Sequence, residues 1–442
     1  MEDPWEWERD PHSSVLDAVP LARWQGISNR QSNLKTDHIP KDKAQELHSL
    51  LYSNQGVRAL EIEKCRRSSW WFFTHWLWTF DKMDPQRPIK RFPQYDYLKE
   101  LTLAHDERRL GKETDKPHIL VVKPRAILFS TWLAAKNLHA LLFQPFFQGY
   151  MMSIKLSRVD DGGKKSTPNS LFGKIRLMHR MLPDWMRERF LLEFSLGSIK
   201  NLQTMASLRA EVAGTDTGVG LQVDQGDIDE AAIVPNLEEI LAVAEPGCPT
   251  GLTVGGTPRG AGTAFHRKVE DSPHKTTYRK FEIDWWMVPN RRVCLKCGST
   301  EYAENGAELR DPDTGEVYHV MIDHTGTDCR PQDGAYFDSS DGRWTSPWFK
   351  KATSNMSEDL KRREFERDFF RAVEGKVYKM LRRREHVVEH EEWRSSGKER
   401  CEFWDHGISD NTAILHAEFD GQRIWNLEYF EQSGETYEYY CR

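Results

Sequence analysis

A short apolar run followed by basic and hydroxyl residues, VVKPRAILFST (121–131), is the first segment whose residue types could do chemistry. The run predicts a buried strand, and the apolar segment that begins at Ser130 predicts a helix. Amides of the connecting loop and of the helix N-terminus would then point toward a bound phosphate. Lys123 and Arg125 could neutralise phosphate charge, and the Ser130 hydroxyl could hold Mg²⁺. The segment therefore predicts a site for a nucleoside triphosphate.

Two residues depart from the standard phosphate loop, GxxxxGK[ST]. Leu128 stands where the second glycine is expected, and Phe129 stands where the lysine is expected. Phe129 and Thr131 flank Ser130, and both belong to the candidate nucleotide-binding set. A strand, a basic pair and a helix start also occur together by chance, so the alternative is a loop without a ligand.

An acidic pair, Asp229 and Glu230, lies in the segment DIDEAA. A phosphate-loop ATPase needs an acid at a strand end to hold Mg²⁺, and often a second carboxylate to polarise the attacking water. The alternative is an exposed acidic turn. The preceding segment LQVDQG (221–226) is less apolar than a buried strand usually is.

A third motif, GLTVGGTPRG (251–260), places Thr257 at the end of an apolar run. A polar residue there can sense the terminal phosphate, although Thr-Pro alone is typical of a turn. The three motifs follow one another in one α/β pattern, separated by predicted helices. Their order and spacing are more specific than any one of them.

A cluster of cysteines follows the three motifs, at the spacing of metal ligands. Cys294 and Cys297 form a CxxC knuckle, and His324 and Cys329 follow it. Three cysteines and one histidine form a ligand set for tetrahedral Zn²⁺, which would be structural rather than catalytic. His319 is a rival fourth ligand, and the alternative is a group of incidental cysteines.

The composition excludes several classes of protein. The chain has 442 residues, of which 38% are apolar and 29% charged. No apolar run approaches the roughly 18 residues of a membrane-spanning helix, which excludes an integral membrane protein. The acidic start argues against a secretory signal, and seven cysteines, two of them at metal-ligand spacing, favour a reducing compartment. With a net charge of −6 the chain is not globally basic, so its overall charge does not indicate nucleic-acid binding. Local basic patches can still bind nucleic acid.

The pattern of elements predicts the fold class. Strands alternate with helices from about residue 92, which predicts an α/β protein with a doubly wound parallel sheet. The aromatic run SSWWFFTHWLWTF (68–80) is too short to span a bilayer and predicts a buried helix. Composition divides the chain into five regions: a variable N-terminal arm (1–60), a phosphate-loop ATPase core (61–290), a zinc-ribbon-like insert (291–345), a charged helical linker or lid (346–398) and a β meander (399–442).

Taken together, these segments resemble the large terminase subunit of tailed bacteriophages, the motor that packages DNA. The resemblance covers roughly residues 90–432 and keeps the family's order. It is carried by KPRAILFSTWLAA, MMSIKLSRVDD, GKIRLMHRMLPDWM, DEAA, VGGTPRG, SEDLKRREFERDFF and FWDHGISDNTAIL. The first of these is similar to the family's deviant phosphate loop, in which the basic residues lie upstream.

The resemblance implies roles for single residues and identifies ATP and Mg²⁺ as cofactors. Asp229 would coordinate the metal together with Ser130, Glu230 would be the catalytic acid, and Thr257 would couple hydrolysis to movement. Gln94, in FPQYDYL, matches an adenine-contacting glutamine. Arg209 matches an arginine that could act as a sensor.

The last region resembles the first strands of an RNase H-like nuclease domain, in which about three carboxylates hold two Mg²⁺ ions. Asp405 would be the first of these catalytic metal ligands, and Asp410 follows in the next turn. The chain reaches Arg442 before a second acid can be placed in the family pattern. We therefore expect a truncated domain that cannot form a complete nuclease site.

The resemblance also implies partners and a location. These are double-stranded DNA, the portal protein of the procapsid, the small terminase subunit and a homo-oligomeric ring, a pentamer, in the host-cell cytoplasm. The basic candidates for DNA contact are Arg362–Arg363, Lys376–Lys379 and Arg382–Arg384. Two alternatives remain open: a helicase-like ATPase, which should bring a second RecA-like unit, and a non-enzymatic zinc-bearing assembly protein with a decayed loop.

Overall fold

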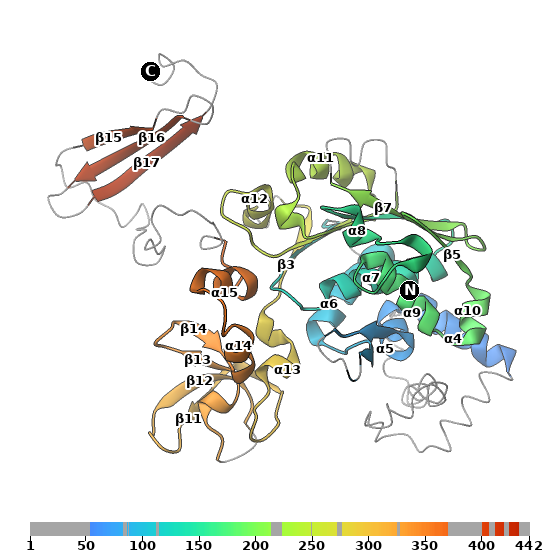
Figure 1. Ribbon diagram of the computed structural model, residues 1–442, viewed down its shortest axis with the longest axis horizontal. Coiled ribbons are helices and arrows are strands. Elements are labelled where there is room, and N and C mark those ends of the chain that lie inside the picture. The colour runs from blue at the N-terminus through green and yellow to red at the C-terminus, as the bar shows by residue number, and fades with distance from the viewer. Residues whose placement is uncertain are drawn as a thin grey trace. The chain divides into compact units, whose positions relative to one another are not determined.

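Figure 1 shows the computed structural model of the chain. The structure describes residues 54–82, 86, 88–111, 115–213, 223–248, 250–271, 276–324, 328–369, 400–405, 412–419 and 424–432. The chain divides into two compact units after Glu374. Several positions named above lie outside the described residues: most of the N-terminal arm, Lys376–Lys379, Arg382–Arg384 and Asp410.

An eight-stranded sheet forms the centre of the first unit. The strand order is β10-β3-β9-β8-β4-β7-β6-β5, and the six strands from β10 to β7 are parallel. The last two strands are antiparallel, so the sheet is mixed where the sequence predicts a parallel one. The bounds are β3 (His118–Val122), β4 (Gln148–Ser153), β5 (Leu192–Ser195), β6 (Ser198–Asn201), β7 (Ala206–Val212), β8 (Gln225–Asp229), β9 (Leu252–Gly256) and β10 (Tyr278–Glu282).

Helices cover both faces of this sheet, with α11 and α12 on one side and α6, α7 and α9 on the other (Figure 1). After His118, the strand β3 is apolar because its alternate residues face opposite layers. Ile119 and Val121 belong to the core under α7, whereas Leu120 and Val122 belong to the core under α11. The described α-helices of this unit are α4 (Gln55–Arg67), α5 (Ser69–Trp76), α6 (Asp96–Arg109), α7 (Phe129–Phe143), α8 (Leu156–Val159), α9 (Leu171–Met181), α10 (Asp184–Arg189), α11 (Leu237–Gly247), α12 (Ala264–Glu270), α13 (Pro289–Arg292), α14 (Pro347–Ala352) and α15 (Glu358–Phe365).

The aromatic run forms a buried helix, as the sequence predicts. Every residue of α5 is buried, and the run then continues into β1 (Trp78–Phe80), which pairs with β2 (Ile89–Arg91). The indoles of Trp71 and Trp76 both donate to the buried Glu61 carboxylate, at 2.8 and 2.6 Å. None of the helices in the described part of the chain is both long and apolar enough to cross a bilayer.

The structure defines where three further segments end or turn. The helix α9 ends at Met181, because Pro183 cannot continue it and is instead the N-cap residue of α10. A turn separates β6 from β7 within 198–206. The helix α15 ends at Phe365, and Arg367 then adopts φ 57°.

A four-stranded antiparallel sheet, β11-β12-β13-β14, follows the core. It consists of β11 (Tyr302–Arg310), β12 (Val317–Ile322), β13 (Tyr336–Asp338) and β14 (Arg343–Thr345). We call residues 294–345 the cysteine module. In the second unit, β15 (Arg400–Asp405), β16 (Thr412–Phe419) and β17 (Ile424–Gln432) form the predicted antiparallel meander.

A buried ion pair joins α7 to β8. The Lys136 ammonium lies 2.6 Å from one carboxylate oxygen of Asp227, and neither side chain is exposed. Asn137 donates to the other oxygen at 2.5 Å and accepts from Gln225 at 3.1 Å. Burial lowers the pKa of Lys136 to about 8, and the Asp227 carboxylate opposes that shift. This polar cluster explains how a strand as polar as QGDID can be fully buried.

We predict that Asp227→Asn destabilises the protein by about 3–5 kcal/mol, because it leaves the Lys136 ammonium buried without its counter-charge. Urea unfolding measures the loss. The double variant Lys136→Met/Asp227→Leu removes both charges and should recover most of it. Glu107→Gln, which breaks the exposed pair with Arg279, serves as the control and should cost less than about 1 kcal/mol. If Asp227→Asn unfolds at the wild-type urea concentration, the pair does not hold α7 to β8.

Candidate functional site

The three predicted motifs meet at one edge of the sheet. In the strand order, β9 lies between β3 and β8, so the loop after β3, Thr257 after β9 and the acidic pair at the end of β8 are neighbours. The Ser130 hydroxyl donates to the Asp229 carboxylate at 2.5 Å, although 99 residues separate them. Thr257 is buried at the end of β9. The carboxyl ends of parallel strands are the usual ligand-binding edge of an α/β sheet.

The loop adopts a backbone that normally requires glycine. Leu128 has φ 63° and ψ 13°, and Ala126 has φ 57°. The left-handed conformation costs a residue with a Cβ roughly 1–2 kcal/mol. Leu128, which stands where the standard loop has its second glycine, thus has a backbone conformation that favours glycine, and α7 begins there without a side-chain cap.

The Phe129 ring and the Lys123 ammonium lie close together beside the phosphate loop. The Phe129 side chain is buried, and a Cβ on Gly255 of β9 would approach its ring to 2.2 Å. The Lys123 ammonium lies 5.4 Å from the centre of the same ring. The cation therefore comes from the start of the loop and lies over the residue that stands where a lysine is expected. Thr131, like Phe129, is buried, whereas Ser130 turns toward the acid.

The loop carbonyls are held by residues that sequence reasoning missed. Arg291 of α13 donates to the carbonyl of Arg125 at 3.4 Å and also to that of Ala126. The Tyr97 hydroxyl donates to the Ile127 carbonyl at 2.8 Å. Tyr97 lies three residues after Gln94, which is exposed before α6. In the described structure, Tyr97 rather than Gln94 thus connects the segment before α6 to the phosphate loop.

Arg125 is engaged by a carboxylate of α15. Its guanidinium pairs with Glu364, and its backbone N–H donates to the Glu364 carbonyl at 2.9 Å. The same buried carboxylate accepts from Arg259, which follows the Thr257 motif, at 3.2 Å and from Arg363 at 3.1 Å. The helix α15 therefore contacts both the phosphate loop and the segment after β9. Arg363, proposed above for DNA contact, is turned toward this carboxylate.

In the acidic pair, the carboxylate of Asp229 is buried and hydrogen-bonded, whereas that of Glu230 is partly exposed. Asp229 is buried, and its second oxygen accepts from the Glu230 N–H at 3.0 Å. Glu230 has φ 62° and is partly exposed. Non-glycine residues with positive φ persist where the surroundings fix them, and they cluster at active sites. Lys174 of α9 is a further cation near Asp229; burial lowers its pKa to about 8, and the Asp229 charge opposes this.

The cysteine module brings four potential metal ligands together. One ligand atom each from Cys294, Cys297, His324 and Cys329 lies within 4.8 Å of the others. The sulfurs of Cys294 and Cys329 are 3.8 Å apart, close to the roughly 3.8 Å edge of a tetrahedron with 2.3 Å metal–sulfur bonds. Both ring nitrogens of His324 are buried without a hydrogen-bond partner in the described structure, as an imidazole aimed at a metal would be. His319, the rival ligand, is exposed on β12 opposite Glu308.

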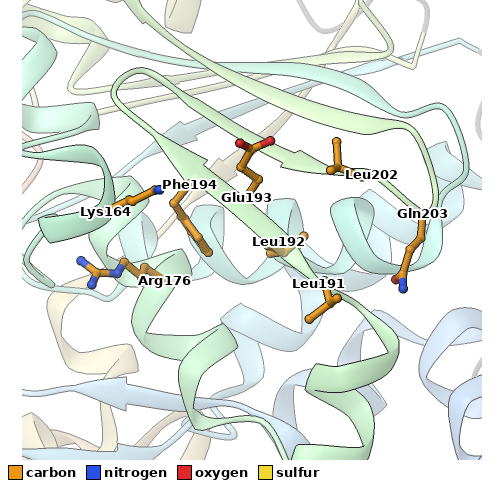
Figure 2. Close-up of a pocket in the computed structure, with 8 residues that line it drawn as sticks. All are labelled: Lys164, Arg176, Leu191, Leu192, Glu193, Phe194, Leu202 and Gln203. Carbon is orange, nitrogen blue, oxygen red and sulfur yellow. The ribbon is translucent and has the colours of Figure 1, made fainter.

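A cavity of about 610 Å³ lies elsewhere, at the β5 edge of the sheet (Figure 2). Its lining includes Leu192 and Phe194 of β5 and Arg176 of α9, and no residue of the loop or the acidic pair. β5 is the last strand in the order, four strands beyond β8. The cavity is therefore separate from the candidate site. Arg209 is likewise remote in the order, exposed on β7 opposite Tyr150 of β4.

We predict that Leu128→Gly keeps the fold and raises the free energy of unfolding by up to about 1 kcal/mol, because glycine adopts this φ without a Cβ clash. Leu128→Val should lower it by a similar amount, since a β-branched residue fits this conformation least. Chemical unfolding of the two variants beside the wild type provides the comparison. A larger loss for glycine than for valine would mean that side-chain packing, not the backbone, governs position 128.

Comparison with known proteins gives structural matches alone. No family model and no curated protein matches the chain. The large terminase of bacteriophage HK97 matches with a TM-score of 0.42 and 12% identity, over 83% of this chain and 67% of that one. The large terminase of the thermophilic bacteriophage D6E, solved in complex with ADP, matches with a TM-score of 0.36 and 12% identity, over 74% and 67%. The large terminase ATPase domain of Thermus phage P74-26 matches with a TM-score of 0.34 and 13% identity, over 59% and 92%.

The chain is therefore similar in structure to phage large terminases over most of its length, at low sequence identity.

Proposed function

We propose that the chain is an ATPase and the motor subunit that moves double-stranded viral DNA into a procapsid. The observation that carries the ATPase assignment is the contact between the Ser130 hydroxyl and the Asp229 carboxylate. A hydroxyl at a helix N-terminus and an acid at a neighbouring strand end are the two protein ligands that phosphate-loop ATPases give to Mg²⁺. Bound Mg²⁺ would neutralise phosphate charge at this place.

The surrounding residues have matching roles in this proposal. The Lys123 ammonium and the amides at the start of α7 contact the phosphates. The partly exposed Glu230 carboxylate orients and deprotonates the attacking water. Thr257 at the end of β9 responds to the terminal phosphate. Arg125 has to exchange Glu364 for a phosphate if it contributes, because the two are paired in the structure.

The packaging assignment is supported by the order of the motifs along the chain.

A translocating ATPase of this kind would hold DNA mainly by its phosphates, so binding should depend on salt and little on sequence. The proposal includes a homo-oligomeric ring, the portal protein and the small terminase subunit as partners, and the host-cell cytoplasm as the location. The described C-terminal strands form an antiparallel meander, which is the element that the motor proposal expects in this region.

We further propose that the meander of the second unit belongs to an RNase H-like nuclease domain. Asp405 is the last residue of β15, opposite Ala413, and offers one carboxylate for a metal ion. Phosphodiester cleavage by two metal ions needs further carboxylates, so we expect no Mg²⁺-dependent cleavage of plasmid DNA by these strands alone.

The metal of the cysteine module is proposed to be Zn²⁺ in a structural role. Three thiolates and an imidazole are soft and borderline ligands that zinc prefers over Mg²⁺ or Ca²⁺. All four protein ligands are supplied, which leaves no open position for a catalytic water.

We predict that Glu230→Gln lowers steady-state ATP hydrolysis by two or more orders of magnitude, roughly the loss expected for a catalytic carboxylate. Binding of a labelled ATP analogue should persist. Glu239→Gln, which changes an exposed carboxylate on α11, is the matched control and should leave the rate unchanged. Rates are measured with and without linear double-stranded DNA. Unchanged hydrolysis in Glu230→Gln would remove that residue from the mechanism, and the absence of nucleotide binding by the wild type would favour the assembly-protein alternative.

We predict that the purified chain holds one zinc ion, measured by elemental analysis, and that Cys329→Ser loses it. Removal of a structural zinc should lower the midpoint of thermal unfolding, because binding contributes folding free energy. Cys248→Ala, which changes a buried free cysteine outside the module, should keep the metal. A metal-free wild type whose unfolding does not respond to added Zn²⁺ would mean that the cysteines pack without a metal.

A further inference from the structure

Arg291 connects the phosphate loop to the start of the cysteine module. It lies in α13, three residues before the metal-ligand candidate Cys294. Its guanidinium donates to two consecutive loop carbonyls and lies 4.4 Å from the ring of Trp348 in α14. The Ser346 hydroxyl, which also caps α14, donates to the Arg291 carbonyl at 2.7 Å. One residue thus joins the loop, the module and α14.

The environment of Arg291 indicates a positioning role. Only 6% of the residue is exposed, and burial lowers its pKa to about 10, so it stays charged at neutral pH. A buried cation is costly unless it forms hydrogen bonds, and here the backbone of the loop accepts them. The loop in turn contains Ala126 and Leu128 in a conformation that persists only when neighbours fix it. Arg291 supplies that support on the Ala126 side.

The residues that follow Arg291 lead directly into the module and contact it. The next residue, Arg292, donates to the carbonyls of Thr300, Trp286 and Met287, at 2.7 to 3.1 Å. Cys294 exchanges backbone hydrogen bonds with the knuckle: its N–H donates to Ser299 and its carbonyl accepts from Gly298. The apolar cluster beneath consists of Ile322 and the three cysteines. So small a core contributes little burial. A metal bound by Cys294, Cys297, His324 and Cys329 would join the two segments, which the Lys296 ammonium also links by donating to the Asp328 carbonyl.

We propose that the cysteine module positions the phosphate loop through Arg291, so that metal occupancy of the module sets the affinity for nucleotide. The nucleotide part rests on the proposed ATPase function, whereas the effect on the loop does not. Arg291 acts here as a positioning residue, because its contacts are with the loop backbone. A coupling of this kind typically changes affinity by about tenfold.

Metal removal tests the proposal in the full chain. Zinc-loaded and chelator-treated proteins are compared by hydrogen exchange and by binding of a fluorescent ATP analogue. We expect faster exchange in peptides covering 121–132 and about tenfold weaker analogue binding after zinc loss. Exchange in β4, which belongs to the central sheet, should stay unchanged and show that the core remains folded. Faster exchange in 294–330 with unchanged exchange in 121–132 would overturn the proposal.

Two variants test the effect of Arg291 on the loop separately from the effect of the metal. Arg291→Lys keeps the charge but loses the two-pronged contact, and it should speed exchange in 121–132 and weaken analogue binding while zinc content stays full. Arg310→Lys is the matched control, because Arg310 donates to the Gly315 carbonyl in a distal turn of the module, and it should change neither. Wild-type loop exchange in Arg291→Lys would overturn the proposal. If zinc-loaded wild type fails to bind the analogue, the ATPase assignment fails, and loop exchange still decides the role of Arg291.

Discussion

The candidate site depends on how α7 is fixed against β8, and the Lys136–Asp227 pair makes that connection. Lys136 lies six residues after Ser130, a rise of about 9 Å along the helix. Asp227 lies two residues before Asp229, about 7 Å along the strand. The two contacts between helix and strand are therefore a similar distance apart on each element, so the buried pair and the Ser130–Asp229 contact are compatible with one rigid arrangement. A hydrophobic pair could pack there as well, but it would tolerate a shift of the helix that a paired charge opposes.

The phosphate loop of this chain lacks the glycine that the standard loop has at position 128, and this has a consequence for how the loop is held. A loop with two glycines adopts left-handed conformations at little cost, whereas here alanine and leucine adopt them. The cost is offset from outside by Arg291 and Tyr97 on the loop carbonyls and by the Glu364 carbonyl on the Arg125 amide. Support that a standard loop contains within itself is distributed here over α6, α13 and α15. These three elements therefore become part of the candidate site without touching a phosphate.

Much of the site could be predicted from the sequence, because local patterns carry it. The strand before Lys123 and the helix at Ser130 follow from hydrophobic runs and their ends. The acids at the end of β8 follow from their residue types and their place among the motifs, because that strand is polar. The cysteine set follows from a CxxC spacing, although only the structure chooses His324 over His319. Lys136, Tyr97, Arg291 and Glu364 were missed because their partners lie far away in the chain. A lysine in the middle of the apolar helix STWLAAKNLHALLF was the one visible signal, since such a residue needs a buried counter-charge.

The packing of Phe129 on Gly255 also constrains how such a loop can change during evolution. A phenylalanine at 129 fits because residue 255 has no side chain, and any larger residue at 255 would collide with the ring. Returning a lysine to 129 by itself would leave a void beneath β9 and bring an ammonium into the apolar core. It would also place that charge beside the one already supplied by Lys123. The path between this loop and the standard one therefore runs through coordinated changes at 123, 129 and 255, which makes the departure from the standard pattern hard to reverse one residue at a time.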